Sequence, residues 1–192
     1  MKHPLAQFLY CPECGSPHFE VNNEKSKKCT DCGFVYYFNP SSATVALILN
    51  EKKELLVCRR AKEPAKGTLD LPGGFIDMNE TGEEGVGREV WEETGLHLTQ
   101  IQGEENSHSL NIVGNQTISI SPFCITQNLS GAYSLLLHTF LCTAEGTLLE
   151  QTDETTNIRW MERNTLKKIV DNSPELIFPL HVQALRKYLN QI

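Results

Sequence analysis

The stretch that decides the fold runs from Gly74 to Leu96 and reads GFIDMNETGEEGVGREVWEETGL. Thr81 followed three residues later by Glu84 has the form of a capping box, in which a hydroxyl and a carboxylate each bind a free backbone N–H at the start of a helix. Gly95 stands where a left-handed residue would end that helix. The sequence therefore predicts a turn followed by a helix of about thirteen residues that begins near Gly82.

Three glutamates share one face of that predicted helix. Glu89, Glu92 and Glu93 stand at i, i+3 and i+4, and a rotation of roughly 100° per residue brings their carboxylates together. Like charges repel, but a divalent cation such as Mg²⁺ or Ca²⁺ takes oxygen ligands and offsets the repulsion. The face is therefore predicted to bind such a cation; the alternative is a solvated acidic helix. Arg88 points elsewhere and is expected to orient one carboxylate or Glu80, just outside the helix.

The same run carries a family resemblance. The pattern G-x5-E-x7-R-E-U-x-E-E-x-G-U, with U apolar, is filled by Gly74, Glu80, Arg88, Glu89, Val90, Glu92, Glu93, Gly95 and Leu96. This run resembles the Nudix box, the signature of Nudix hydrolases, and Leu69–Gly74 is similar to the strand and turn that lead into it. The resemblance implies an α/β fold, an α/β/α sandwich with a mixed sheet. It also implies metal-dependent hydrolysis of the diphosphate linkage in a nucleoside diphosphate derivative, with release of a nucleoside monophosphate.

The resemblance also implies the site residues. The implied catalytic residues are Glu80, Arg88, Glu89, Glu92 and Glu93, with magnesium or manganese bound by Glu89, Glu92 and Glu93. In Nudix proteins an acidic residue outside the box often completes the metal site or acts as base. Glu154, in the acidic loop 150–154, is the candidate, and a merely solvated loop is the alternative. Gly73, Gly74 and Arg60 are candidates for substrate binding. Arg60 is one because a guanidinium binds phosphate or carboxylate with two donors. For Arg60, a plain surface charge is an equal alternative.

Two C-x2-C-Gly turns predict a second metal site, with Cys11, Cys14, Cys29 and Cys32 as its ligands. Gly15 and Gly33 are free to take positive φ, and four thiolates supply a tetrahedral zinc site. A redox dithiol or disulfides are the alternatives. Residues 1–40 are too few to bury a core, so a structural metal is expected there. We therefore expect a zinc ribbon at 1–40 and a Nudix hydrolase domain at 41–192.

Net charge and hydropathy indicate which classes of partner the protein can bind. The net charge of −7 and the pI near 5.4 disfavour nucleic-acid binding, although a nucleotide-derived substrate remains compatible with a metal site. Lysines and aromatics of the ribbon offer a possible basic surface (Lys25, Lys27, Lys28, Phe19, Phe34, Tyr36, Tyr37, Phe38). Packing of these aromatics onto the next domain is the favoured interpretation. No apolar run of about 18 residues predicts a membrane span, so a cytoplasmic protein is expected.

Patterns outside the box predict the remaining elements. They are a strand–turn–strand hairpin from Thr44–Leu49 and Leu55–Arg60, a strand at Thr117–Ser121, a central strand at Tyr133–Cys142, and helices at Arg163–Val170 and Leu180–Leu189. Cys58, Cys124 and Cys142 lie in apolar stretches and are assigned no chemistry.

The resemblance leaves the substrate open. Some Nudix hydrolases carry a zinc ribbon before the catalytic domain, including bacterial NADH pyrophosphatases and plant enzymes that act on FAD or ADP-ribose. The NADH pyrophosphatases have a further motif, SQPWPFP, of which Ser121-Pro122-Phe123 is only a fragment. A preference for a nicotinamide dinucleotide is therefore not implied, and ADP-ribose, FAD or another nucleoside diphosphate derivative is an equal candidate. The alternatives are a non-catalytic nucleotide sensor or regulator and a hydrolase of nucleotide-capped RNA. Because related enzymes are often dimers, a homodimer is also open.

Overall fold

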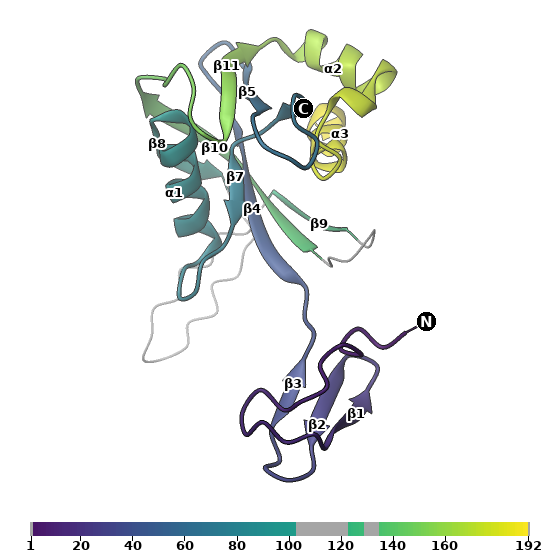
Figure 1. Cartoon of the computed structure of the whole chain (residues 1–192). Coiled ribbons are helices and arrows are strands. Elements are labelled where there is room, and N and C mark those ends of the chain that lie inside the picture. Colours follow the sequence, from purple (N-terminus) through teal and green to yellow (C-terminus); the bar gives the residue numbers. More distant parts are fainter. Residues whose placement is uncertain (1, 103–122, 129–134, 192) are drawn as a thin grey trace. The chain divides into compact units, whose positions relative to one another are not determined.

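The computed structural model describes residues 2–102, 123–128 and 135–191 of the chain (Figure 1). The chain divides into two compact units, Met1–Pro40 and Ser41–Ile192, which are described in turn. None of the helices in these residues is both long enough and apolar enough to cross a lipid bilayer.

The small unit is a three-stranded antiparallel sheet joined to two cysteine turns. Its strands, in the order β1-β2-β3, are β1 (Phe19–Asn23), β2 (Ser26–Cys29) and β3 (Val35–Tyr37). The Gly15 N–H donates to the Cys11 carbonyl at 2.9 Å, and the Gly33 N–H donates to the Cys29 carbonyl at 3.0 Å. Both glycines have positive φ, 73° and 80°, as the sequence predicts. The two turns therefore have the same geometry.

Only part of the predicted lysine set of this unit is on its surface. Lys27 is buried, its Nζ donates to the Phe8 carbonyl at 2.6 Å, and it lies 5.0 Å from the centroid of the Phe19 ring. Lys25 and Lys28 are exposed. Lys27 therefore stabilises the packing of the ribbon and does not extend a basic surface.

The large unit contains two sheets. In the first, β7 (Gly73–Phe75), β4 (Ser41–Ile48), β10 (Leu135–Gly146) and β8 (Leu96–Gln102) lie in that order, and β9 (Cys124–Asn128) also pairs with β10. β10 runs parallel to β4 and antiparallel to β8 and β9, so this sheet is mixed. The second sheet is antiparallel, with the order β11 (Thr155–Met161), β5 (Leu55–Arg60), β6 (Leu69–Asp70). The described part of the predicted central strand Tyr133–Cys142 has partners on both sides, which confirms its position.

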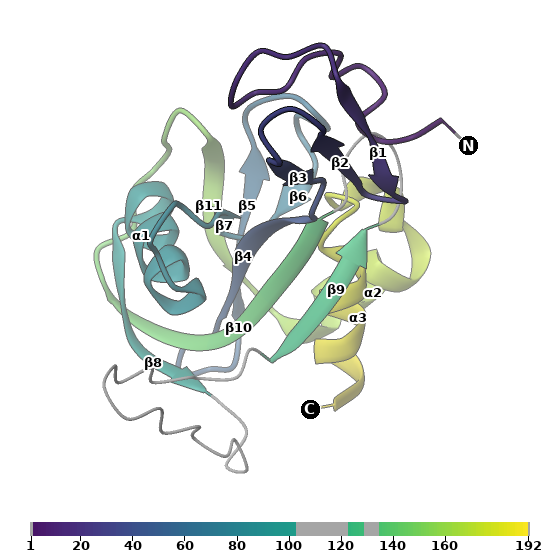
Figure 2. The same ribbon diagram turned by 90° about the horizontal axis from the view of Figure 1, so that it is seen from below.

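Helices cover both faces of the mixed sheet (Figure 2). One face carries α1 (Gly82–Thr94), and the other carries α2 (Arg163–Asn172), the 3₁₀ turn η1 (Pro174–Leu176) and α3 (Val182–Gln191). Within β4, Val45 and Leu47 pack in the core beside α2 and α3, whereas Ala46 and Ile48 pack in the core beside α1. Successive strand residues point to opposite faces, so this uninterrupted apolar strand is buried on both. The α/β/α arrangement with a mixed sheet is confirmed.

The helix of the box begins and ends where the sequence predicts. It spans Gly82–Thr94, with Thr81 as N-cap. The Glu84 N–H donates to Thr81 Oγ1 at 3.2 Å, and the Thr81 N–H donates to Glu84 Oε2 at 2.8 Å, which completes the capping box. Gly95 has φ 75° and its N–H donates to the Trp91 carbonyl at 2.9 Å.

The two strands of the predicted hairpin are confirmed, but their predicted pairing with each other is wrong. Within the described residues, β4 and β5 meet at one isolated bridge, between Leu49 and Leu55, and then join different sheets. The polar turn between them reverses the chain, as predicted, but does not decide how far the strands stay paired. Partners distant in sequence decide that, because β10 pairs with β4 and β11 pairs with β5.

The two C-terminal helices are confirmed with shifted ends. Helix α2 runs two residues beyond the predicted Arg163–Val170, and α3 starts and ends two residues later than the predicted Leu180–Leu189. The strand predicted at Thr117–Ser121 lies outside the described residues.

Candidate active site

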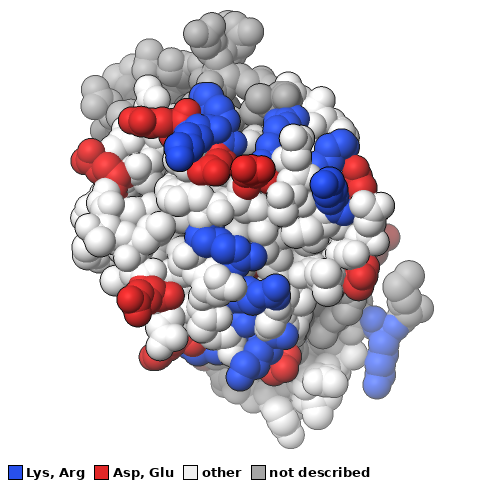
Figure 3. All heavy atoms as spheres, turned by 90° about the horizontal axis from the view of Figure 1, so that it is seen from above, with Lys and Arg blue, Asp and Glu red and all other residues white. Residues whose placement is uncertain are grey.

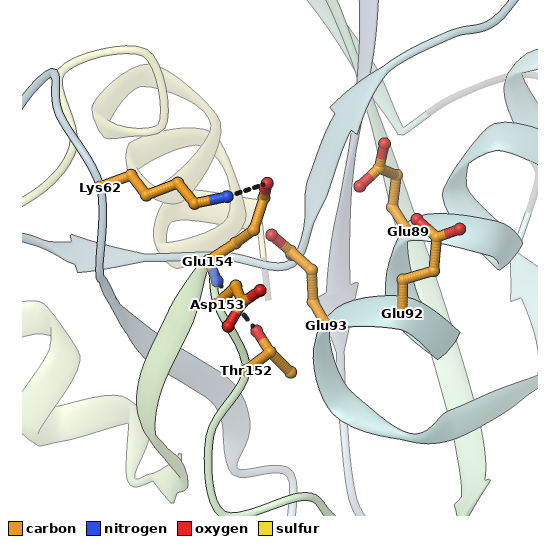
Figure 4. A pocket seen from close by; sticks show the side chains of 7 residues that line it. All are labelled: Lys62, Glu89, Glu92, Glu93, Thr152, Asp153 and Glu154. Atoms are coloured by element: carbon orange, nitrogen blue, oxygen red, sulfur yellow. Dashed lines mark hydrogen bonds and ion pairs between the residues drawn. The ribbon is translucent and has the colours of Figure 1, made fainter.

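A cavity of about 410 Å³ lies beside α1. Its lining residues are Lys62, Glu89, Glu92, Glu93, Thr152, Asp153 and Glu154. The three glutamates of α1 stand on one side, and Lys62 and Glu154 stand on the other (Figure 4). Lys62 follows β5 and Glu154 precedes β11, so the antiparallel pairing of these strands brings together residues 92 positions apart. The cavity is therefore assembled from the box helix and the adjoining ends of two strands.

Glu93 connects three segments at this cavity. Its side chain accepts a hydrogen bond from the Gly73 N–H at 2.9 Å, and its backbone carbonyl accepts one from Thr155 Oγ1 at 3.0 Å. Gly73 belongs to β7 and Thr155 opens β11. With 7% of its surface exposed, Glu93 is buried, unlike the other carboxylates that line the cavity.

Burial makes the charged form of Glu93 unfavourable. Desolvation raises the pKa of Glu93 to about 8, and the negative charges of Glu89, Asp70 and Glu154 act in the same direction. Desolvation also raises the pKa of Glu89, although Arg88 opposes that rise. A divalent cation would replace the proton and compensate these charges. Carboxylate oxygens are ligands that Mg²⁺ and Mn²⁺ take, but among the described residues the ligand atoms of Glu89, Glu92 and Glu93 do not all lie within 4.8 Å of one another. Binding of magnesium or manganese by these three residues stays a prediction.

Arg88 fixes the carboxylates around it. Its Nε donates to Glu80 Oε1 at 2.9 Å, and its Nη1 donates to Glu89 Oε1 at 2.8 Å and Glu92 Oε2 at 3.2 Å. Its Nη2 donates to the Phe75 carbonyl at 3.0 Å. These contacts raise the pKa of Arg88 and, chiefly through Arg88, lower the pKa of Glu80. Glu80 does not line the cavity and reaches it only through Arg88.

Gly73 and Gly74 allow β7 to approach β4 and α1 closely. Gly73 has φ 153°, and a Cβ there would stand 2.7 Å from the Cα of Val45 in β4. A Cβ on Gly74 would overlap the carboxylate of Glu89. Gly73 therefore requires glycine for steric reasons, because the backbone atoms around it cannot move aside, whereas a side chain at Gly74 would require the Glu89 carboxylate to move. Their predicted contact with substrate stays a prediction.

Arg60, the other predicted substrate-binding residue, does not line the cavity. Its Nη1 lies 3.2 Å from Asp70 Oδ2, its Nε donates to the Pro64 carbonyl at 2.7 Å, and its guanidinium lies 4.4 Å from the centroid of the Phe178 ring. These contacts hold the loop after β5 and link it to the chain before α3. Phosphate binding by Arg60 stays a prediction.

The four cysteines of the small unit fit a zinc ion. Their sulfurs lie within 4.8 Å of one another, and among the described residues no other group of three or more such ligand atoms does. Sulfurs about 2.3 Å from one tetrahedral ion stand about 3.8 Å apart, and the Cys11–Cys32 and Cys14–Cys29 sulfur pairs are 3.7 Å apart. Backbone N–H groups of Cys32 and Asp31 lower the pKa of Cys29 to about 6, whereas the neighbouring Cys32 thiol and burial raise the pKa of Cys14 to about 12. The fit to zinc therefore rests on the sulfur positions.

Two residues of the cavity region, Lys62 and Thr155, are not predicted by the sequence patterns. Lys62 is one of two lysines in the loop after β5, and Thr155 is one threonine at the start of a strand, so neither belongs to a recognisable motif. Thr155 of β11 pairs with Arg60 of β5, and this register places Thr155 and the nearby Lys62 beside the box helix. Only knowledge of that strand register would have singled them out.

In the absence of Mg²⁺ or Mn²⁺, the protein is expected to lose stability as the pH rises from about 4.5 to about 8. The pKa of Glu93 is higher in the folded state than in the unfolded state, so the folded state binds more protons in this interval. The contribution of Glu93 to the free energy of unfolding is full below about pH 4.5 and is lost as the pH rises through about 8. One group contributes at most about 1.4 kcal/mol per pH unit.

Urea unfolding at several pH values between these limits measures this effect. Glu93→Gln should flatten the pH dependence, because a glutamine does not titrate, whereas Glu83→Gln, on the same helix but away from the cavity, should keep it. Equal slopes for wild type and Glu93→Gln would contradict the prediction.

Comparison with known proteins gives matches over much of the chain. The profile of the NUDIX domain matches residues 39–179. Over 100 residues the chain is 29% identical to the NAD-capped RNA hydrolase NudC of Vibrio parahaemolyticus, a match that covers 52% of this chain and 38% of that protein. Over 60 residues it is 47% identical to an ADP-ribose pyrophosphatase of Methanocaldococcus jannaschii, covering 31% and 35%. Thus these matches span less than half the length of either relative.

A solved structure resembles most of the chain in fold. A NUDIX hydrolase from Nitrosomonas europaea superposes with a TM-score of 0.65 at 20% identity, covering 95% of this chain and 90% of that one. At that identity the likeness concerns the fold alone.

Proposed function

The chain belongs to the Nudix family of pyrophosphohydrolases. From this premise we propose that it hydrolyses the diphosphate linkage of a nucleoside diphosphate derivative of the ADP-ribose, FAD or NADH class. The reaction releases a nucleoside monophosphate. The observation that carries the proposal is the convergence of Glu89, Glu92, Glu93 and Glu154 on one cavity. In this proposal residues 1–40 form a structural zinc ribbon and residues 41–192 form the hydrolase domain.

The proposal assigns a role to each glutamate that lines the cavity and to the residues that hold these glutamates. Magnesium or manganese bound by Glu89, Glu92 and Glu93 would neutralise phosphate charge and lower the pKa of the attacking water. Arg88 holds Glu89 and Glu92 in position, and Glu80 holds Arg88. Glu154 accepts the proton that the water loses. The new bond joins the water oxygen to one phosphorus, and the bond from that phosphorus to the bridging oxygen breaks.

The names of two relatives support the substrate class. One is an NAD-capped RNA hydrolase and the other an ADP-ribose pyrophosphatase. NAD and ADP-ribose share an adenosine joined to ribose through a diphosphate. An ADP-ribosyl compound is therefore the first substrate to test for this chain.

Nucleotide-capped RNA is the second candidate, because of the capped-RNA hydrolase among the relatives. The charge of the chain, −7, opposes retention of an RNA body. The face in Figure 3 carries Lys and Arg side chains beside Asp and Glu side chains, so its basic groups are interspersed with acidic ones. A non-catalytic nucleotide sensor is disfavoured, since every glutamate of the box is present.

A substrate panel tests the proposal. The purified protein is incubated with Mg²⁺ or Mn²⁺ and NADH, FAD, ADP-ribose, diadenosine polyphosphates, nucleoside triphosphates or an RNA with a 5′ NAD cap, and released monophosphate is measured. We expect one of the first three compounds to be cleaved fastest. Preference for a triphosphate would contradict the substrate class, and binding without turnover of any compound would favour the sensor.

A further inference from the structure

Lys62 is the one cation among the residues that line the active-site cavity. The other charged residues of the wall are all acidic: Glu89, Glu92, Glu93, Asp153 and Glu154. Figure 4 shows Lys62 reaching toward Glu154, across the cavity from the glutamates of α1. A negatively charged substrate that enters between these walls therefore meets positive charge from the protein at Lys62.

The loop that carries Lys62 is held at both ends, and the Lys62 ammonium contacts Glu154. Its Nζ lies 2.8 Å from Glu154 Oε1, and the N–H of Ala61, the preceding residue, donates to the Glu154 carbonyl at 2.8 Å. Beyond it, Arg60 Nε donates to the Pro64 carbonyl at 2.7 Å. Side-chain and backbone contacts thus hold the ammonium beside Glu154, which reduces the conformational entropy lost when a ligand binds it.

The ammonium also keeps free donor capacity. A lysine has three N–H donors, and Glu154 takes one. The side chain is 53% exposed, so a ligand in the cavity has access to it. The contact with Glu154 raises the pKa of Lys62 and keeps it charged. Lys62 is therefore able to contact Glu154 and an anion at the same time.

We propose that Lys62 binds a phosphate oxygen of the substrate diphosphate, on the side of the cavity opposite α1. This inference rests on the proposed function. Divalent ions held by the glutamates of α1 would compensate the negative charge of the diphosphate on the α1 side of the cavity. Lys62 compensates it on the opposite side. A phosphate bound by Lys62 would also lie next to Glu154. Arg60, two positions earlier in the chain, does not line the cavity and is engaged by Asp70 and Phe178.

The competing interpretation is that Lys62 and Glu154 form an ordinary surface ion pair. Such pairs are common and contribute little. In that case Lys62 would influence the ligand only by holding Glu154, and its removal would have no effect once Glu154 is neutral. The two interpretations therefore differ in a background that lacks the Glu154 charge.

The test is the affinity for α,β-methylene-ADP, a nucleoside diphosphate analogue with no cleavable P–O–P link, measured by calorimetry with Mg²⁺. Lys62→Met should weaken binding by about tenfold or more, the scale of a hydrogen bond between charged groups, and Lys62→Arg should restore most of the affinity. Lys66→Met removes the same charge from the same loop outside the cavity lining and should leave the affinity unchanged. Melting temperatures verify that each variant is folded.

The same measurement in a Glu154→Gln background separates direct from indirect action. Persistence of the Lys62→Met effect there supports the proposal, and its disappearance overturns it. Equal affinities of Lys62→Met and Lys66→Met overturn it as well. If the wild-type protein binds the analogue and hydrolyses an ADP-ribosyl substrate, either negative result removes only the role of Lys62. If the wild type hydrolyses no compound of the substrate panel, the proposed function fails. If it hydrolyses an ADP-ribosyl substrate without binding the analogue, the KM values of Lys62→Met and Lys66→Met for that substrate give the same comparison.

Discussion

Glu93→Gln is expected to lower kcat by about 100-fold or more, the scale of losing one charge-stabilising group in an active site. Glu93 is the buried carboxylate of the cavity, and its proposed role is to hold a divalent ion. A neutral amide is a weaker ligand for Mg²⁺ than a carboxylate. Its carbonyl oxygen can still accept the hydrogen bond of the Gly73 N–H, so the contact between β7 and α1 should persist.

Steady-state hydrolysis of the best substrate of the panel measures this effect, and circular dichroism checks the fold. Glu83→Gln is the matched control, because it makes the same substitution on the same helix outside the cavity lining. A folded Glu93→Gln protein with the wild-type rate would remove Glu93 from the proposed site. Loss of rate in the control as well would indicate a general effect of charge on α1.

Gly73→Ala is expected to lower the free energy of unfolding by about 2 to 5 kcal/mol, as the sum of backbone strain and overpacking. The residue has φ 153°, and a Cβ there would meet backbone atoms of Thr44 and Val45, which cannot move aside as a flexible side chain can. β7 must therefore shift away from β4. Because the Gly73 N–H donates to Glu93, we also expect kcat to fall by about 100-fold, the scale of a misplaced catalytic group.

Gly87→Ala provides the control for this substitution. Gly87 lies within α1 with no heavy atom within 4 Å of an added Cβ, so alanine there should be neutral or should stabilise the helix by up to about 1 kcal/mol. Urea unfolding and steady-state rates of the two variants give the comparison. A Gly73→Ala protein as stable and active as Gly87→Ala would contradict the close approach of β7 to β4.

The parts of this protein that are formed by neighbouring residues could be read from its sequence. The capping box joins Thr81 and Glu84, and the periodicity of α1 brings Glu89, Glu92 and Glu93 to one face. The two cysteine turns follow from repeated spacing and from glycines with positive φ. Each of these features is a short-range hydrogen bond or dihedral angle, so the residues that make it lie within a few positions of one another.

The tertiary structure alone decided which strands pair and which charges meet. The turn after β4 predicted a hairpin, yet β4 pairs with β10 and β5 with β11. That pairing brings Lys62 to Glu154 and leaves Arg60 against Asp70 and Phe178. It also contributes to the burial that raises the pKa of Glu93. Sheet pairing and burial depend on residues far apart in the chain, and local sequence patterns carry no record of such partners.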